Sequence, residues 1–136
     1  MLSQKTKYAL QALAHLASAY GKGPVLIPVI AENKKIPLRF LENILHELKQ
    51  DGMLRSTRGR QGGYELVKEP STIRLADIIR KVEGPIAMLS CVSLHFYERC
   101  PGCTENHCGL NKVMIDARDA ILSVLEGKTL ADIVDD

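Results

Sequence analysis

The sequence predicts a mainly α-helical (α+β) chain: a winged helix-turn-helix followed by a long C-terminal helix. Three observations support this fold class. A short helical segment and a longer amphipathic one are joined by a tight connection within residues 28–51. Two strand-like segments flank a glycine-rich, basic tip at residues 59–63, and a long apolar pattern of helical period covers residues 109–126. With 46% hydrophobic residues, the 136 residues are enough for one core.

Composition narrows the classes of protein. No apolar run is long enough for a transmembrane helix, and the N-terminus lacks a signal peptide, so we expect a cytoplasmic protein with no membrane partner. The absence of Trp argues against a binder that stacks single-stranded bases. Residues 1–70 contain 11 Lys and Arg against 6 Asp and Glu, whereas residues 71–136 contain 7 against 10. A basic first half suits a polyanionic partner, with ordinary scatter of charge as the alternative.

The first helix is expected over residues 4–20. Ser3 can cap it by accepting a hydrogen bond from an early backbone N–H, and apolar residues then recur at helical spacing. Gly21 ends the helix and Pro24 prevents it from resuming. Residues 25–27 are too short for a helix and predict a small strand.

The next two helices have the outline of a helix-turn-helix. Pro28 suits the first position of a short helix that runs to residue 34, and Pro37 begins a longer one that ends near Asp51. The longer helix has an apolar face and a polar face, and the polar face contains Arg39, Glu42, Asn43, His46 and Lys49. Two packed amphipathic helices without a nucleic-acid role are an equal alternative at this point.

A predicted β-hairpin follows directly. Residues 53–58 and 64–68 are strand-like, and the tip between them contains Gly59, Arg60 and two further glycines. Arg58 and Arg60 could enter a minor groove or hold phosphates, and the glycines allow close approach of the backbone to another surface. A helix-turn-helix followed by such a hairpin indicates a winged helix. A surface hairpin that is basic only for solubility is the alternative.

The rest of the chain predicts a helix over residues 75–82, a loop, a long helix over residues 109–126 and a last short helix over residues 130–134. We expect a DNA-binding region in residues 1–84, a cysteine-rich loop in residues 85–108 and a dimerisation segment in residues 109–136. Paired long helices would build a homodimer whose two heads match two half-sites of a pseudo-palindromic operator. In the alternative, the long helix packs on its own chain.

All four cysteines lie within one stretch of eighteen residues. The candidate metal ligands are Cys91, Cys100, Cys103, Cys108 and His107. Clustered thiolates suit an iron–sulfur cluster, and four of them also suit a structural zinc ion, for which the Cys100-x-x-Cys103 spacing is half of a typical site. A redox pair that forms a disulfide between Cys100 and Cys103 is a third possibility. The residues alone leave zinc and iron–sulfur open.

These residues together resemble the bacterial Rrf-two family of transcription regulators, over essentially the whole chain. The matching stretches are residues 7–10, 36–45, 52–59, 62–64, 75–79, 82–85 and 129–132. The resemblance implies a dimeric winged helix-turn-helix repressor or activator that binds double-stranded DNA. It places Arg39, Phe40, Glu42 and Asn43 on the helix that faces the major groove, Arg58, Gly59 and Arg60 in the wing, and Lys5, Thr6 and Lys7 at phosphates.

The resemblance also implies an iron–sulfur cluster, of two or four irons, held by three cysteines of the loop. Cys91, Cys100 and Cys108 match those three best, and Cys103 is an extra cysteine relative to the commonest pattern. The fourth ligand is then expected nearby, with Cys103 first and His107 second. The expected function is a regulator that senses iron–sulfur, redox or nitric oxide status. The alternatives are a zinc-stabilised or thiol-redox regulator, or a small redox metalloprotein without a DNA partner.

An enzyme is not expected. The cysteines are accompanied by no carboxylate pair and no set of nucleophile and base of the kind that catalysis requires.

Overall fold

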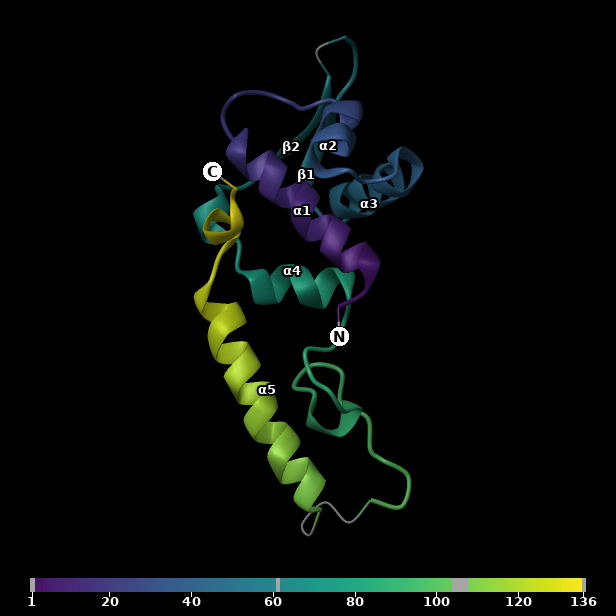
Figure 1. Cartoon of the computed structure of the whole chain (residues 1–136), viewed down its shortest axis with the longest axis vertical. Coiled ribbons are helices and arrows are strands. Elements are labelled where there is room, and N and C mark those ends of the chain that lie inside the picture. Colours follow the sequence, from purple (N-terminus) through teal and green to yellow (C-terminus); the bar gives the residue numbers. More distant parts are fainter. Residues whose placement is uncertain (1, 61, 104–107, 136) are drawn as a thin grey trace.

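The structure is a computed structural model of the whole chain, and it describes residues 2–60, 62–103 and 108–135. It consists of a head and a long extension (Figure 1). The helices and strands of the head are α1 (Gln4–Ser18), α2 (Ile27–Lys34), α3 (Leu38–Gln50), β1 (Leu54–Thr57), β2 (Gly63–Leu66), the 3-10 helix η1 (Pro70–Thr72) and α4 (Leu75–Val82). The extension contains the 3-10 helix η2 (Ser90–Val92) and α5 (Gly109–Gly127), and a last 3-10 helix, η4 (Leu130–Ile133), returns to the head.

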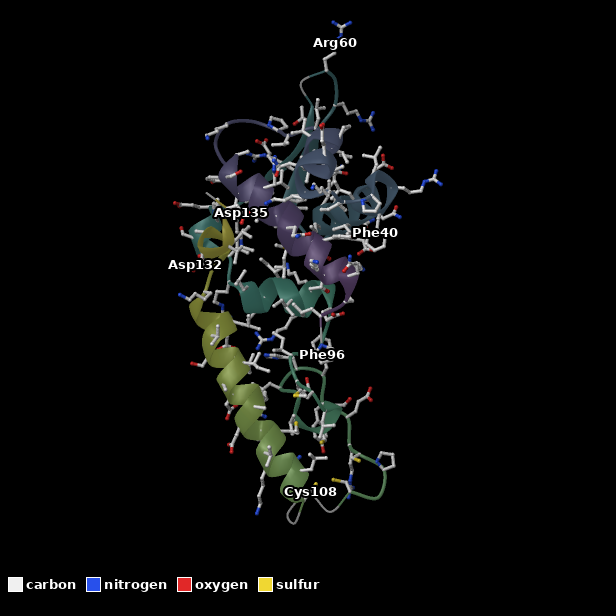
Figure 2. The ribbon with its side chains drawn as sticks, in the orientation of Figure 1. Phe40, Arg60, Phe96, Cys108, Asp132 and Asp135 are labelled. Atoms are coloured by element: carbon white, nitrogen blue, oxygen red, sulfur yellow. The ribbon has the colours of Figure 1, made fainter. Side chains whose placement is uncertain are left out.

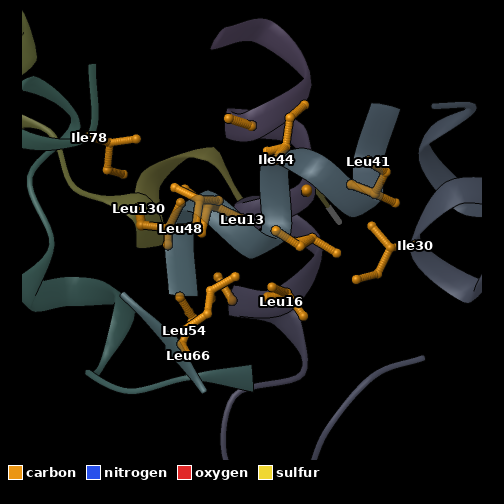
Figure 3. Close-up of a cluster of buried hydrophobic side chains, with 14 of the residues drawn as sticks. Leu13, Leu16, Ile30, Leu41, Ile44, Leu48, Leu54, Leu66, Ile78 and Leu130 are labelled. Carbon is orange, nitrogen blue, oxygen red and sulfur yellow. The ribbon is translucent and has the colours of Figure 1, made fainter. Parts of the chain in front are cut away.

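The head is built around one apolar core. Helices α1 and α3 contribute most of it, and α2, the hairpin, α4 and η4 close its sides (Figure 3). Its largest fully buried side chains are Leu13, Leu16, Ile30, Leu41, Leu45, Leu48, Leu66, Ile78 and Leu130. Burying an aliphatic side chain of this size stabilises a fold by about 1.5–3 kcal/mol, so this core holds α2, α3 and the hairpin in a fixed arrangement.

The local signals in the sequence explain the helix boundaries. The Ser3 hydroxyl accepts from the Thr6 backbone N–H at 3.2 Å and caps α1. Lys35 ends α2 in the left-handed region, with φ 54° and ψ 48°, and the Ile36 N–H returns to the Ala31 carbonyl at 3.0 Å. This tight reversal sets α2 against α3 as a helix-turn-helix, as predicted.

The prediction of a strand at residues 25–27 is correct for Val25 and wrong for the two residues that follow it. Only Val25 pairs, as an isolated antiparallel bridge with Tyr64, and α2 already begins at Ile27 with Pro28 in its first turn. The bridge brings a third segment against the hairpin. A Cβ on Gly63 would lie 2.1 Å from the Val25 carbonyl oxygen, so this close approach requires glycine.

The wing is an antiparallel hairpin in which Leu54 pairs with Leu66 and Thr57 pairs with Gly63. Leu54 and Leu66 are buried at the base of the hairpin, whereas residues 55–60, on the first strand and at the tip, are exposed. The apolar base therefore anchors the hairpin in the core and leaves the basic tip projecting away from the head (Figure 1).

The chain leaves the head at α4 and comes back after α5. The Leu75 N–H donates to the Lys128 carbonyl at 3.0 Å, and the Leu130 N–H donates to the Ile73 carbonyl at 2.8 Å. Thr129 and Asp132 form a capping box at the start of η4, and the side chain of Leu130 is buried in the head. The segment beyond α5 is thus part of the head, and both ends of the extension are tied to it.

Helix α5 has little cover from its own chain. Of its residues only Leu122 is buried, and it packs beside α4 and η2. No helix within the described ranges is long and apolar enough to cross a lipid bilayer.

Candidate functional site

Helix α3 presents its polar face to the surface. Leu41, Ile44, Leu45 and Leu48 are buried on the side that packs against α1 and α2, and the opposite side is exposed. Arg39, Glu42 and Asn43 are all on that exposed side. An α-helix with one free polar face is the element that fits a major groove, and these side chains have the donors and acceptors that distinguish base edges.

Phe40 lies at the edge of this face. Its ring packs edge-to-face on Tyr8 of α1, with centroids 5.5 Å apart and an interplanar angle of 80°, and 41% of the residue remains exposed. Figure 2 shows it on the outer side of α3. The contact fixes the orientation of α3 on α1, so the structure gives Phe40 a packing role alongside the predicted groove contact.

The tip of the wing is basic and exposed. Arg58, Gly59 and Arg60 are all exposed, and Arg60 projects beyond the rest of the hairpin (Figure 2). Within the part of the chain that the structure describes, neither Arg58 nor Arg60 forms an ion pair. Arg55, lower on β1, is instead paired with Glu65 across the hairpin at 2.8 Å. Two unneutralised guanidinium groups are therefore available to an anion at the tip.

Three residues near the start of α1 were expected to contact phosphates, and the structure is inconsistent with one of them. Thr6 is fully buried and its hydroxyl lies 3.2 Å from the Ser3 hydroxyl, so it cannot reach a phosphate, and the prediction for Thr6 is wrong. Thr6 instead stabilises the first turn of the helix. Lys7 is exposed. Lys5 forms an ion pair with Glu47 of α3 at 2.7 Å, in which both side chains remain largely accessible.

The four cysteines line one cavity at the far end of the extension. Cys91 belongs to η2, Cys108 caps the N-terminus of α5, and Cys100 and Cys103 lie in the loop between them. The cavity has a volume of about 430 Å³. Figure 2 shows sulfur atoms at this end of the molecule, with Cys108 at the beginning of α5. His107 lies outside the described residues.

Asn111 links two of these cysteines, and it is the residue that the sequence did not reveal. Its backbone N–H donates to the Cys108 sulfur at 3.4 Å, and its side-chain Nδ2 donates to the Cys91 sulfur at 3.5 Å. Both contacts place a hydrogen-bond donor on a thiol, which stabilises negative charge there. The only local signal was its place three residues after Cys108, where the N–H of a helix normally needs a cap.

The four thiols are suitable ligands for a soft metal, but they do not all point to one position in the structure. All four are unoxidised. Among the described residues, no three His, Cys, Asp or Glu side chains lie close enough together to hold a metal ion. Four thiols around one cavity are nevertheless the donor set that zinc and iron–sulfur clusters take.

A chain of polar contacts connects the cysteine cavity to the head. Arg118 of α5 donates to the Val92 carbonyl of η2 at 2.9 Å, next to Cys91. Near the other end of α5, Glu126 accepts from Arg80 of α4 at 3.1 Å. Glu83, at the end of α4, accepts from the backbone N–H of Ser3, the cap of α1. These contacts link η2 to α5, α5 to α4, and α4 to the start of α1.

Comparison with known proteins agrees with this architecture. The family model Rrf2, described as "Iron-dependent Transcriptional regulator", matches residues 2–136. An rrf2-like HTH-type transcriptional regulator of Rhodobacter capsulatus is 38% identical over 138 residues, covering 98% of this chain and 92% of that protein.

Two solved structures are similar over almost the whole chain. The structure of CymR, the global cysteine regulator of B. subtilis, has a TM-score of 0.82 and 32% identity, covering 98% of this chain and 95% of that chain. IscR of T. potens has a TM-score of 0.78 and 32% identity, covering 98% and 85%. The fold, the helix-turn-helix and the wing are thus shared with transcription regulators, and the chain belongs to the Rrf2 family of DNA-binding transcription regulators, which are not enzymes.

Proposed function

We propose that this protein is a dimeric regulator that senses iron–sulfur, redox or nitric oxide status through a cluster held by its cysteines. The observation that supports the proposal most is the placement of all four thiols around one cavity, on an extension tied to both sides of a DNA-reading head. A bound cluster would supply a centre that reacts with oxidants and nitric oxide.

The DNA contacts follow from the exposed side chains of the head. Glu42 can accept from the exocyclic amine of cytosine, and Arg39 can donate two hydrogen bonds to guanine or hold a phosphate. Asn43 can pair with adenine by the same logic. Arg58 and Arg60 of the wing would lie at the minor groove or at phosphates, and Lys5 and Lys7 at the flanking backbone.

A second copy of the chain is the expected occupant of the bare side of α5. Leu110, Val113, Ile121 and Val124 of this helix are each 39–59% exposed, and a soluble monomer rarely leaves such an apolar stripe uncovered. Pairing two α5 helices across a two-fold axis would cover the stripe and present two heads to the half-sites of a pseudo-palindromic operator.

The ligands of the proposed centre are Cys91, Cys100 and Cys108, with Cys103 as the fourth. Cys103 lines the same cavity as the other three, which supports it as the fourth ligand. Asn111 would orient Cys91 and Cys108 through its two hydrogen bonds. Joining these four residues would fix the loop against α5 and η2, and through Arg118 and Glu126 would bias the position of α4 on the head.

Purification without air tests the proposal directly. We expect a coloured protein with visible absorbance and matching amounts of iron and acid-labile sulfide. Replacing Cys91, Cys100 or Cys108 by Ser should remove colour and iron. Comparing Cys103→Ser with His107→Ala identifies the fourth ligand, because only the true ligand should lower the iron content. A colourless product without iron would contradict the cluster.

Structural zinc is the second candidate. The observation that favours it is the Cys100-x-x-Cys103 turn, since two cysteines at this spacing commonly form half of a zinc site. Zinc would hold the loop permanently rather than respond to redox signals. About one zinc ion per chain in protein purified without added metal, lost together with the fold of the loop on chelation, would favour this reading over the cluster.

A further inference from the structure

Residues 100–103 of the cysteine cavity form a tight turn. The Cys103 N–H donates to the Cys100 carbonyl at 3.1 Å. Pro101 fixes its own φ, and Gly102 has φ +69°, which are the features of a type II turn. Arg99 Nη2 also donates to the Cys103 carbonyl at 3.4 Å, so the turn is held from outside as well.

We infer that Cys100 and Cys103 form a reversible disulfide, a redox-modification site separate from the pair that Asn111 holds. The first and last Cα atoms of such a turn lie within about 7 Å of each other, which overlaps the roughly 4.4–6.8 Å that a disulfide spans. A link that closes only four residues restricts the unfolded chain very little, so it suits reversible chemistry better than structural reinforcement.

The surroundings of the four thiols favour this pair over the others. Cys91 and Cys108 lie on η2 and at the N-terminus of α5, and each accepts a hydrogen bond from Asn111. Those hydrogen bonds hold the two sulfurs separately, one through the backbone and one through the side chain of Asn111. Cys100 and Cys103 share one turn, and Cys100 is exposed whereas Cys103 is partly buried. An incoming oxidant therefore meets Cys100 first, whose thiol now faces the Pro101 carbonyl at 3.8 Å and must rotate toward Cys103 at the other end of the turn.

A low-molecular-weight disulfide, RSSR, is the oxidant class that fits this arrangement. The Cys100 thiolate attacks one sulfur of RSSR, forming a mixed disulfide and releasing one RS⁻. The Cys103 thiolate then attacks the Cys100 sulfur, forming the intrachain disulfide and releasing the second RS⁻. Two protein thiols lose two electrons and two protons, and RSSR becomes two RSH.

The disulfide also limits what the cavity can bind, and this consequence alone rests on the proposed function. Metals and clusters bind thiolates, so a chain with a Cys100–Cys103 disulfide keeps only Cys91 and Cys108 as sulfur ligands. Oxidation of the turn and occupancy of the cluster site would then exclude each other.

Peptide mapping of the metal-free, full-length chain tests the inference. The chain is equilibrated without air in buffers of oxidised and reduced glutathione, alkylated and digested with trypsin. Trypsin places Cys91 on peptide 82–99 and the other three cysteines on peptide 100–112. We expect peptide 100–112 to bear one alkyl group, which cleavage after Glu105 should locate on Cys108, and peptide 82–99 to be alkylated. Three alkyl groups on peptide 100–112, or a cross-link between the two peptides, would overturn the inference.

Two glycines supply a matched test of the turn. A Cβ on Gly102 or on Gly109 would meet nothing within 4 Å, but only Gly102 has a positive φ. Gly102→Ala should reduce the fraction of disulfide at a given glutathione ratio several-fold, whereas Gly109→Ala should leave it unchanged. An equal effect of both variants would refute the role of the turn. Cys108→Ser should retain the disulfide while losing the proposed cluster, so the two proposals fail separately.

Discussion

The basic residues at the tip of the wing are proposed to contact DNA through single side chains. Arg58 and Arg60 are exposed and form no ion pair among the described residues, whereas Arg55 on the same hairpin is neutralised by Glu65. A cation already paired within the protein contributes less to phosphate binding, because its partner must be displaced first. The three arginines therefore form an internal comparison.

Replacing Arg58 or Arg60 by Ala should weaken operator binding. Each residue that neutralises a phosphate contributes about one unit to the slope of log K against log salt concentration, so each variant should lower that slope by about one unit. Arg55→Ala is the control and should leave the slope close to that of the wild type. Titration of labelled operator DNA at several salt concentrations measures all three. Equal slopes in all the variants and the wild type would remove the wing from the interface.

The side chain of Asn111 is expected to stabilise the proposed metal centre. Asn111→Ala deletes the donor to Cys91, and loss of such an outer hydrogen bond typically lowers metal affinity about 10–100-fold. We expect faster loss of iron to a chelator, measured from the decay of visible absorbance. The neighbouring exposed Lys112→Ala should decay as the wild type does. Indistinguishable rates for Asn111→Ala and the wild type would show that this hydrogen bond does not support the centre.

The residue scale also shows what the sequence could and could not indicate. The exposed positions of Arg39, Glu42 and Arg58 follow from helical and hairpin periodicity, which needs only local information. Thr6 was placed at a phosphate through the family resemblance, whereas its position on α1 turns its side chain inward. The second contact of Asn111 joins residues 20 positions apart, and no local pattern encodes that proximity.

At the scale of the elements, α5 is the least covered helix. Its length and apolar pattern are predictable from sequence, but whether it packs on its own chain or on another copy is not, since both use the same apolar residues. The structure leaves Val113 and Val124 each 59% exposed. The exposed stripe is the reason that we assign it to a partner chain.

A charge on this stripe should separate the two copies. Val113→Asp or Val124→Asp would bury a carboxylate in the proposed dimer contact, and we expect the dissociation constant of the dimer to rise at least tenfold, about 1.4 kcal/mol. Ser123→Asp adds the same charge to an exposed polar position of α5 and should have little effect. Sedimentation equilibrium measures the constant. Dimers that persist unchanged in both valine variants would place the interface elsewhere.

The 3-10 helix η4 shows a different limit of sequence reasoning. Its start at Thr129 is predictable from the capping signal, but its docking on the head is not, because that depends on Leu130 entering a core built from distant segments. The strand expected at residues 25–27 failed for a related reason. Pro28 in the first turn of α2 and the bridge from Val25 to Tyr64 together leave only one residue paired.

Asp132 should make stability depend on pH at this docking point. The Thr129 backbone N–H donates to its carboxylate at 2.7 Å, and this hydrogen bond lowers the pKa of Asp132 below its usual value. The unfolded chain therefore takes up the proton at higher pH than the folded one. The stabilisation is complete above the ordinary carboxyl pKa, near 4, and is lost as the pH falls through the folded-state pKa.

We therefore expect Asp132→Asn to destabilise the protein at neutral pH. The free energy of unfolding of this variant should also depend less on pH than that of the wild type. Urea unfolding between pH 7 and pH 3 should show the difference in free energy of unfolding between wild type and variant narrowing as the pH falls. A difference that stays constant or widens over this range would contradict the assigned hydrogen bond.

At the scale of the whole molecule, the two ends of the extension are tied to a single head. Arg80 and Glu126 join α4 to α5, and Arg118 joins α5 to η2 beside Cys91. The sequence indicated the order of these parts and the family to which they belong. It could not indicate these ties, which join residues 26 and 46 positions apart and depend on how the helices cross. The proposed coupling between the cysteine cavity and the head depends on these ties.

A ligand can shift this arrangement only if it binds the two positions of the extension with different affinity. A cluster that fixes the cysteine loop meets this condition if the fixed loop orders α5 and η2 relative to α4. By linkage, the operator then also changes the affinity for the cluster by the same factor. A coupling of about 1–3 kcal/mol is typical of such systems and corresponds to about a 5–150-fold change in affinity.

The most direct measurement compares the operator affinity of protein reconstituted with its cluster without air and of the same preparation after removal of the metal. Fluorescence anisotropy at fixed salt concentration gives both dissociation constants. We predict that they differ at least fivefold, and that Cys91→Ser gives the metal-free value under both conditions. Equal constants for the two forms of the wild type would contradict the coupling between the cysteine cavity and the DNA-reading head.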